Sequence, residues 1–181
     1  MHWPSTLPRR DICHEGVFIV TYRSMEDSLS DLETILQDNL KTTLTTVASE
    51  HTSTVALPAP SDYSYFVANS VETIPDIQNL PAIVLIGWNE SIALEGEQDW
   101  DLWNFDQAVR LWASDSEAQK LNKRIYRYAD AIVRLVRNNY LDLQNVKSIT
   151  DLRVDYSSVS PTDPLYQALE VSFVTLACRE Y

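Results

Sequence analysis

Four carboxylates lie close together between two apolar stretches, and they are the residues best placed for acid–base catalysis or calcium binding. They are Glu95, Glu97, Asp99 and Asp101. Paired carboxylates can act as a general acid and a general base, and calcium prefers oxygen ligands. However, the run lacks the spacing and the central glycine of an EF-hand loop. A solvated acidic loop is the simpler interpretation, and a small enzyme that uses these carboxylates stays open as an alternative.

Other sequence motifs that carry chemistry are missing. The three glycines, Gly16, Gly87 and Gly96, form no phosphate-binding loop, no dinucleotide fingerprint and no nucleophile elbow. Cys13 and His14 are adjacent, but one cysteine and one histidine do not complete a zinc site. We therefore predict no catalytic residue, no metal ion and no cofactor, and a protein that is not an enzyme.

Basic side chains are concentrated in one segment. Between Asp115 and Asn138 there are six basic and three acidic residues, which give this segment a net charge of +3. The total charge is −12, so the remaining residues carry −15. The six basic residues are Lys120, Lys123, Arg124, Arg127, Arg134 and Arg137.

Two explanations of this basic segment stay open. Charged residues are seldom buried, so a solvated helix face is the simpler one. A contact with an acidic partner, including another copy of this chain, is the sharper hypothesis. The strongly acidic remainder of the chain disfavours a general DNA-binding surface.

Four of the five tryptophans lie between residues 88 and 112. Trp88 and Trp112 belong to strand-like apolar runs, which favours a position in the core. Trp100 and Trp103 lie near the acidic run and are harder to bury. Because tryptophan is enriched at protein interfaces, Trp100 and Trp103 join the six basic residues as candidate interface residues.

An amphipathic helix over residues 114–137 is predicted to position the basic side chains. Ser114 and Glu117 have the spacing of a capping box at its start. Apolar residues then recur at intervals of three and four, which places them on one face. They are Leu121, Ile125, Tyr128, Ile132 and Leu135. Alternating polar and apolar side chains predict two further strands, over residues 148–156 and 165–178.

The first part of the chain predicts one more helix and three more strands. Leucines at helical spacing indicate a helix over residues 24–47 that starts at Ser24. The expected strands cover residues 63–71, 82–88 and 105–112, and the second continues after a bulge at Gly87 or a turn at residues 89–90. Runs of strands broken by a helix predict an α+β fold, with a mostly antiparallel β-sheet packed against two main helices.

Composition and length indicate the overall organisation. We predict an extended N-terminal arm over residues 1–16 and a single α+β domain over residues 17–181. A net charge of −12 disfavours binding to nucleic acid or to anionic membranes. No stretch approaches the roughly 20 apolar residues that span a bilayer. The N-terminal residues lack the apolar core of a signal peptide, so we expect a cytosolic origin.

Three segments carry a family resemblance. They are PAIVL at residues 81–85, SEAQKLNKRIYRYADAIVRLV at residues 116–136, and SITDLRVDYSSVSPTDPLYQALEVSFVTLACRE at residues 148–180. In this order they resemble the tail terminator proteins of tailed bacteriophages, also called tail completion or neck proteins. The resemblance covers residues 17–181 and is clearest from residue 114 onward. Residues 1–16 and 96–105 have no counterpart in the family pattern.

The resemblance implies an α+β subunit of a hexameric ring that caps the tail tube and joins the tail to the head. The partners are then other copies of the chain, the tail tube protein or sheath, and the head–tail connector. DNA passes through the lumen without sequence readout. The family has no enzymatic activity, so no catalytic residue is carried over. Assembly in the host cytoplasm and a place in the virion follow.

Two further hypotheses remain as alternatives to a tail terminator. One is another head–tail joining protein, such as a connector or stopper. The other is an adaptor that binds an acidic protein through the basic side chains of residues 114–137.

Overall fold

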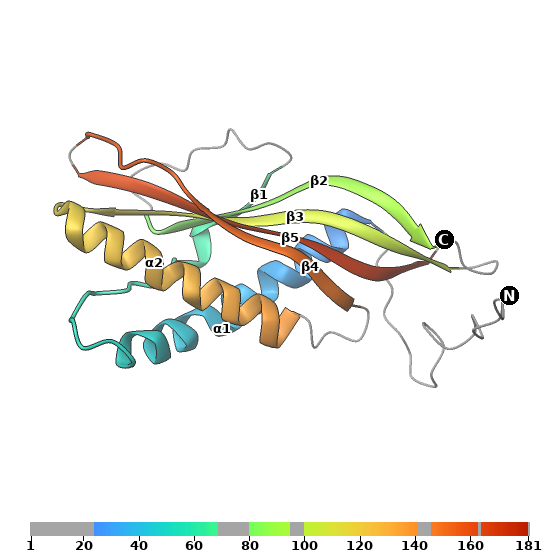
Figure 1. The fold of residues 1–181 in the computed structure, drawn as a ribbon, viewed down its shortest axis with the longest axis horizontal. Coiled ribbons are helices and arrows are strands. Elements are labelled where there is room, and N and C mark those ends of the chain that lie inside the picture. Colours follow the sequence, from blue (N-terminus) through green and yellow to red (C-terminus); the bar gives the residue numbers. More distant parts are fainter. Residues whose placement is uncertain (1–23, 69–79, 95–99, 141–145, 163, 181) are drawn as a thin grey trace, which may run out of the picture.

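A five-stranded sheet covered on one face by two helices forms the fold (Figure 1). The computed structural model describes residues 24–68, 80–94, 100–140, 146–162 and 164–180. The predicted α+β class, with a mostly antiparallel sheet and two main helices, is confirmed. The predicted arm at residues 1–16 lies outside the described residues.

The sheet is mixed, with the strand order β1-β2-β3-β5-β4. β1 pairs in parallel with β2, and the other three neighbouring pairs are antiparallel. The strands are β1 (Tyr65–Ala68), β2 (Ala82–Leu94), β3 (Trp100–Asp115), β4 (Val146–Tyr156) and β5 (Leu165–Glu180). β3 and β5 are longer than their sequence patterns predict, whereas β2 continues past a bulge at Gly87, which was one of its two predicted alternatives. In Figure 1 these three strands extend past both helices toward the C-terminus.

The helix α1 (Met25–Ser49) matches its predicted position. At its start, the backbone N–H of Ser24 donates a hydrogen bond to the Asp27 carboxylate at 3.1 Å, which satisfies a group that the helix itself leaves unpaired. The apolar residues at helical spacing are all buried, as expected for the core face of an amphipathic helix. They are Leu29, Leu32, Leu36, Leu40, Leu44 and Val47.

The helix α2 (Ala118–Leu135) starts later than the sequence predicts, and the predicted capping box at Ser114 is wrong. Ser114 is still part of β3, which pairs with β5 as far as Asp115. The Asp115 carboxylate accepts the backbone N–H of Glu117 at 3.0 Å and so marks the transition to the helix. Long-range strand pairing therefore overrides a local helix-start signal. A π-helical turn, Val136–Tyr140, follows α2.

A buried polar cluster links α1 and the π-helical turn after α2 to the centre of the sheet. The Gln107 side-chain N–H donates to Thr175 Oγ1 at 2.7 Å, to Ser28 Oγ at 3.1 Å and to the Tyr140 hydroxyl at 3.1 Å. All four side chains are fully buried. The cluster joins α1, β3, β5 and the π-helical turn, and because a buried polar group is costly without its partners, it favours this one arrangement of the four elements.

Candidate functional site

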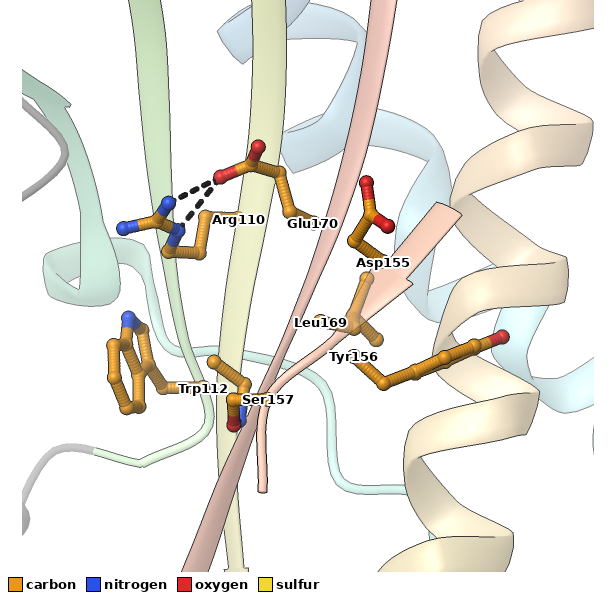
Figure 2. A pocket seen from close by; sticks show the side chains of 8 residues that line it. Arg110, Trp112, Asp155, Tyr156, Ser157, Leu169 and Glu170 are labelled. Carbon is orange, nitrogen blue, oxygen red and sulfur yellow. Dashed lines mark hydrogen bonds and ion pairs between the residues drawn. The ribbon is translucent and has the colours of Figure 1, made fainter. Parts of the chain in front are cut away.

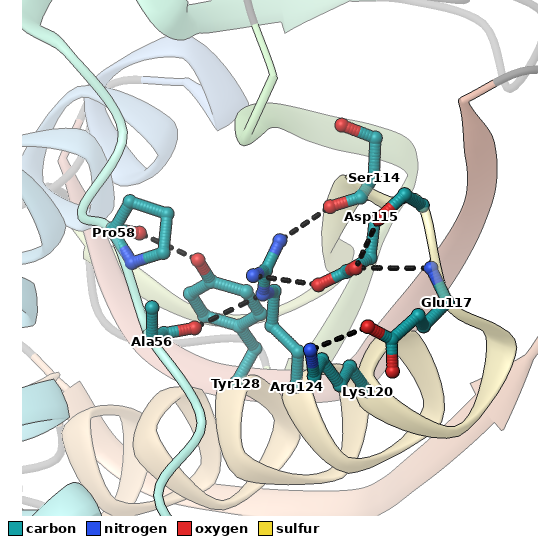
Figure 3. A network of polar contacts seen from close by, with 9 residues as sticks. Ala56, Pro58, Ser114, Asp115, Glu117, Lys120, Arg124 and Tyr128 are labelled. Carbon is teal, nitrogen blue, oxygen red and sulfur yellow. Dashed lines mark hydrogen bonds and ion pairs between the residues drawn. The ribbon is translucent and has the colours of Figure 1, made fainter.

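The loop between α1 and β1 lies along α2 and is held there by side chains of the helix (Figure 3). Arg124 is central to this arrangement. Its guanidinium donates to the carbonyl of Ala56 at 3.0 Å, to the carbonyl of Ser114, and pairs with the Asp115 carboxylate at 2.8 Å. Both members of that ion pair are largely shielded from solvent. Arg124 therefore joins the loop, the end of β3 and the start of α2.

Two more α2 side chains bind the same loop. The Tyr128 hydroxyl donates to the carbonyl of Pro58 at 2.5 Å, and burial raises the pKa of Tyr128. The Arg127 guanidinium donates to the carbonyl of Ser53 at 2.8 Å and to its hydroxyl at 2.7 Å. Arg127 is only 4% exposed, so it does not contribute to the surface of this chain.

The next two predicted interface residues form ion pairs with acids of the same chain. Arg134 binds both carboxylate oxygens of Glu50, at 2.8 and 2.7 Å, and also Asp130. These hydrogen bonds lower the pKa of Glu50 and raise the pKa of Arg134. Lys120 pairs with Glu117 at 2.5 Å, and this hydrogen bond raises the pKa of Lys120. Both pairs are substantially exposed to solvent.

The structure separates the six basic residues by what holds them. Arg124 and Arg127 are held by loop carbonyls, while Lys120 and Arg134 are in exposed ion pairs. Lys123 and Arg137 are exposed, and within the described ranges neither makes a hydrogen bond or an ion pair. These last two are the basic residues most available to a partner. Sequence spacing could not distinguish the basic residues that bind the loop from those that do not, because this loop lies about 70 residues earlier in the chain.

Among the tryptophans, Trp88 differs from its expected position in the core. Trp103 is half-buried against the core, and the Arg179 guanidinium lies over its ring, 4.2 Å from the ring centroid. Trp100 begins β3, but its side chain is outside the described part of the structure. Trp88, expected in the core, is 53% exposed. A register shift between Gly87 and Asn89 leaves Trp88 without a cross-strand partner, so the alternation of β2 is broken there.

The acidic run is described only in part. Asp101 lies in β3 opposite Arg179 of β5, whereas Glu95, Glu97 and Asp99 are outside the described residues. In the part of the chain that the structure describes, no group of three or more His, Cys, Asp or Glu side chains could hold a metal ion. Cys178 is fully buried in β5 and is disulfide-bonded.

A pocket of about 320 Å³ lies on the sheet face away from the helices (Figure 2). Arg110 and Trp112 of β3 line it together with Asp155 and Glu170. The Arg110 guanidinium donates to Glu170 with an Nε–Oε2 distance of 2.9 Å, and Asp155 pairs with Arg153 at 2.7 Å. Each pocket carboxylate thus already has an arginine of this chain beside it.

No family model matches this chain, and no curated protein matches it in sequence. Among the described residues, neither helix combines the length and the apolar character needed to cross a membrane.

The arrangement contains one feature that the sequence pattern did not single out. α1 carries five acidic residues and one basic residue, a net charge of −4, whereas α2 carries five basic residues and one acidic residue, a net charge of +4. Both helices cover the same face of the sheet and contact each other. The acids between the leucines of α1 are visible in the sequence, but only the fold places them in the same layer as the exposed Lys123 and Arg137.

Proposed function

We propose that this chain is a structural subunit of a phage virion, a tail terminator that assembles into a ring on the tail tube. The exposed acids of α1, together with the exposed Lys123 and Arg137 of the α2 region, carry the proposal. Exposed acids of α1, such as Glu26 and Asp38, face solvent on the same layer as the exposed Lys123 and Arg137 of the α2 region. A molecule with one acidic and one basic surface can join further copies head to tail.

A contact between the α2 region of one copy and α1 of the next is heterologous. Heterologous contacts form closed rings when the rotation between subunits closes, and open filaments when it does not. The resemblance to tail terminators favours the closed form, a hexamer. It also supplies the partners of the ring, which are the tail tube protein or sheath on one side and the head–tail connector on the other.

The proposed ring surrounds DNA without reading its sequence. A subunit with a net charge of −12 repels the phosphate backbone, so DNA slides through the lumen instead of binding there. The protein then acts without a catalytic residue or cofactor. It is assembled in the host cytoplasm and remains in the virion at the end of the tail.

Light scattering and negative-stain microscopy of the purified chain, alone and mixed with tail tubes, test this proposal. We expect rings, and rings at the ends of tubes. A chain that stays monomeric in the presence of tubes would overturn the proposal. Binding to purified portal complexes instead of tubes would favour the connector alternative.

Charge reversal tests the surface that we assign to the ring contact. The double change Lys123→Glu and Arg137→Glu should prevent ring formation, and adding Glu26→Lys and Asp38→Lys should restore it. Lys41→Glu is the matched control, because Lys41 is an exposed lysine that belongs to α1. If the Lys41 variant and the double variant assemble equally well, the helices are not the contact.

A further inference from the structure

The outer edge of β2 is covered over only part of its length. β1 pairs with residues 83–86 of β2, and the remaining residues, 87–94, have a strand neighbour only on the β3 side within the described part of the sheet. Figure 1 shows the end of β2 continuing beyond β1 and beyond the helices. An edge of this kind presents backbone N–H and C=O groups that another strand can bind.

Apolar side chains accompany this free edge. Trp88 is 53% exposed and Ile92 is 48% exposed, which are high values for large apolar residues. Trp88 stands out of the regular alternation because of the register shift between Gly87 and Asn89. At Gly87 a Cβ atom would lie 2.5 Å from the Met25 side chain of α1, so a larger residue there would displace Met25. The start of α1 thus packs closely on β2 beside the bulge at which Trp88 is exposed.

The edge carries almost no free charge. Glu90 is the single charged residue between 88 and 94, and its carboxylate is already occupied. It accepts the backbone N–H of Met25 at 2.9 Å and pairs with Arg179 at 2.6 Å. Copies of a chain with a net charge of −12 repel one another in general, but two β2 edges can approach without bringing unpaired acids together.

The opposite edge of the sheet is protected. β4 carries Asp151 with a positive φ of 52°, inside an irregular stretch between Thr150 and Arg153. Arg153 and Asp155 form an exposed ion pair on the same strand. The exposed charges of β4 oppose strand addition there, whereas the two register shifts of β2, between Gly87 and Asn89 and between Ile92 and Leu94, carry no exposed charged side chain. β4 is therefore a poor partner for the free edge of a second copy, and β2 itself is the better one.

We propose that residues 88–94 of β2 pair antiparallel with the same residues of a second copy, around a two-fold axis near Ser91. This register places Trp88 of each copy opposite Leu94 of its partner, and Glu90, whose carboxylate is paired with Arg179 of its own chain, opposite Ile92. The two sheets then continue across the contact. The surface differs from the helix faces assigned to the ring, so the proposal stands whether or not the ring forms.

Sedimentation of the full chain over a micromolar concentration series tests the pairing. The double change Trp88→Lys and Ile92→Lys should weaken dimer formation by about tenfold or more, because charge at a sheet edge opposes strand addition. Tyr63→Lys is the matched control, since Tyr63 is 91% exposed and precedes β1, which pairs with residues 83–86 of β2 and not with residues 88–94. A chain that shows no dimer, or a dimer equally sensitive to both changes, would refute the pairing.

A cysteine introduced at the proposed axis gives a second measurement that does not depend on dimer affinity. The Ser91→Cys variant should form a covalent dimer on mild oxidation much faster than Ser30→Cys, which places an exposed cysteine on α1. Equal rates would contradict a two-fold axis at Ser91. Ser91→Cys combined with Lys123→Glu and Arg137→Glu should cross-link as fast as Ser91→Cys alone, which separates this contact from failure of the ring.

Discussion

The two helices resemble each other in the face that they bury and differ in the face that they expose. α1 buries a row of leucines, and its threonines bond mainly to backbone carbonyls one turn earlier, as Thr34 does to Ser30 and Thr43 to Asn39. α2 buries a similar apolar row, but its polar side chains reach outward to a distant loop. Amphipathic periodicity therefore describes how each helix packs, and says little about what its charged side chains do.

The strongest change in stability tests what the helices share. Leu36→Ala in α1 and Ile132→Ala in α2 each remove a fully buried side chain, so each should lower the free energy of unfolding by about 3 kcal/mol. Urea denaturation monitored by circular dichroism measures this loss. Thr45→Ala on the exposed side of α1 is the control. A much smaller loss in one helix would show that the two are not equally part of the core.

A second pair of variants tests how the helices differ. Arg124→Met leaves Asp115, whose side chain is 9% exposed, without its cation, and frees two backbone carbonyls. We expect a loss of about 2 kcal/mol in the free energy of unfolding. The neighbouring Lys123→Met should change it very little, because Lys123 is exposed and unpaired within the described residues. Similar stabilities of the two variants would contradict the role of Arg124 in holding the loop.

A weaker effect is expected at alkaline pH. Burial, followed by the nearby carboxylates of Asp62 and Glu33, raises the pKa of Tyr65 to about 12. An unfolded tyrosine ionises near pH ~10, so between about 10 and 12 the unfolded chain loses this proton while the folded chain keeps it. Stability therefore falls as the pH rises through this window. Tyr65→Phe should make the fall shallower in urea denaturation at a series of alkaline pH values.

Two variants refine the alkaline experiment. Tyr63→Phe removes a tyrosine that is 91% exposed. The loss of stability at alkaline pH should then be the same as in the unchanged chain. Glu33→Gln removes an acid of α1 and should lower the pKa of Tyr65 somewhat, since burial is the larger cause. If the free energy of unfolding falls equally at alkaline pH with and without the Tyr65 hydroxyl, Tyr65 is not the source of the fall.

The weakest effect on stability concerns Arg134, whose ion pairs are exposed to solvent. Arg134→Gln should barely change stability, because exposed ion pairs are screened by water and salt. The measurable change is instead a rise in the pKa of Glu50, which loses the hydrogen bonds that lower it. NMR titration of the Glu50 carboxyl group detects this rise. A large loss of stability would place Arg134 with Arg124 as a residue that holds the loop.

Periodic stretches of the sequence predict the elements of this fold well, and their junctions less well. The leucines of α1, the alternation in β4 and the apolar row of α2 each depend on nearby residues, so their patterns identify them. The predicted start of α2 was wrong, because Ser114 pairs with Tyr166 of β5 instead of capping the helix. The extra length of β3 likewise comes from its pairing with β2 and β5, which local patterns do not contain.

Local sequence patterns were enough to predict the fold class, the buried faces and the concentration of basic residues in α2. The roles of those basic residues came from the packed chain, in which Arg124 and Arg127 bind a loop while Lys123 and Arg137 remain available to a partner. The exposure of Trp88 and the position of Trp103 beneath Arg179 also depend on that packing. Periodicity specifies the direction in which a side chain leaves its own helix or strand. Its exposure to solvent and its hydrogen-bond partners depend on which distant residues pack against it.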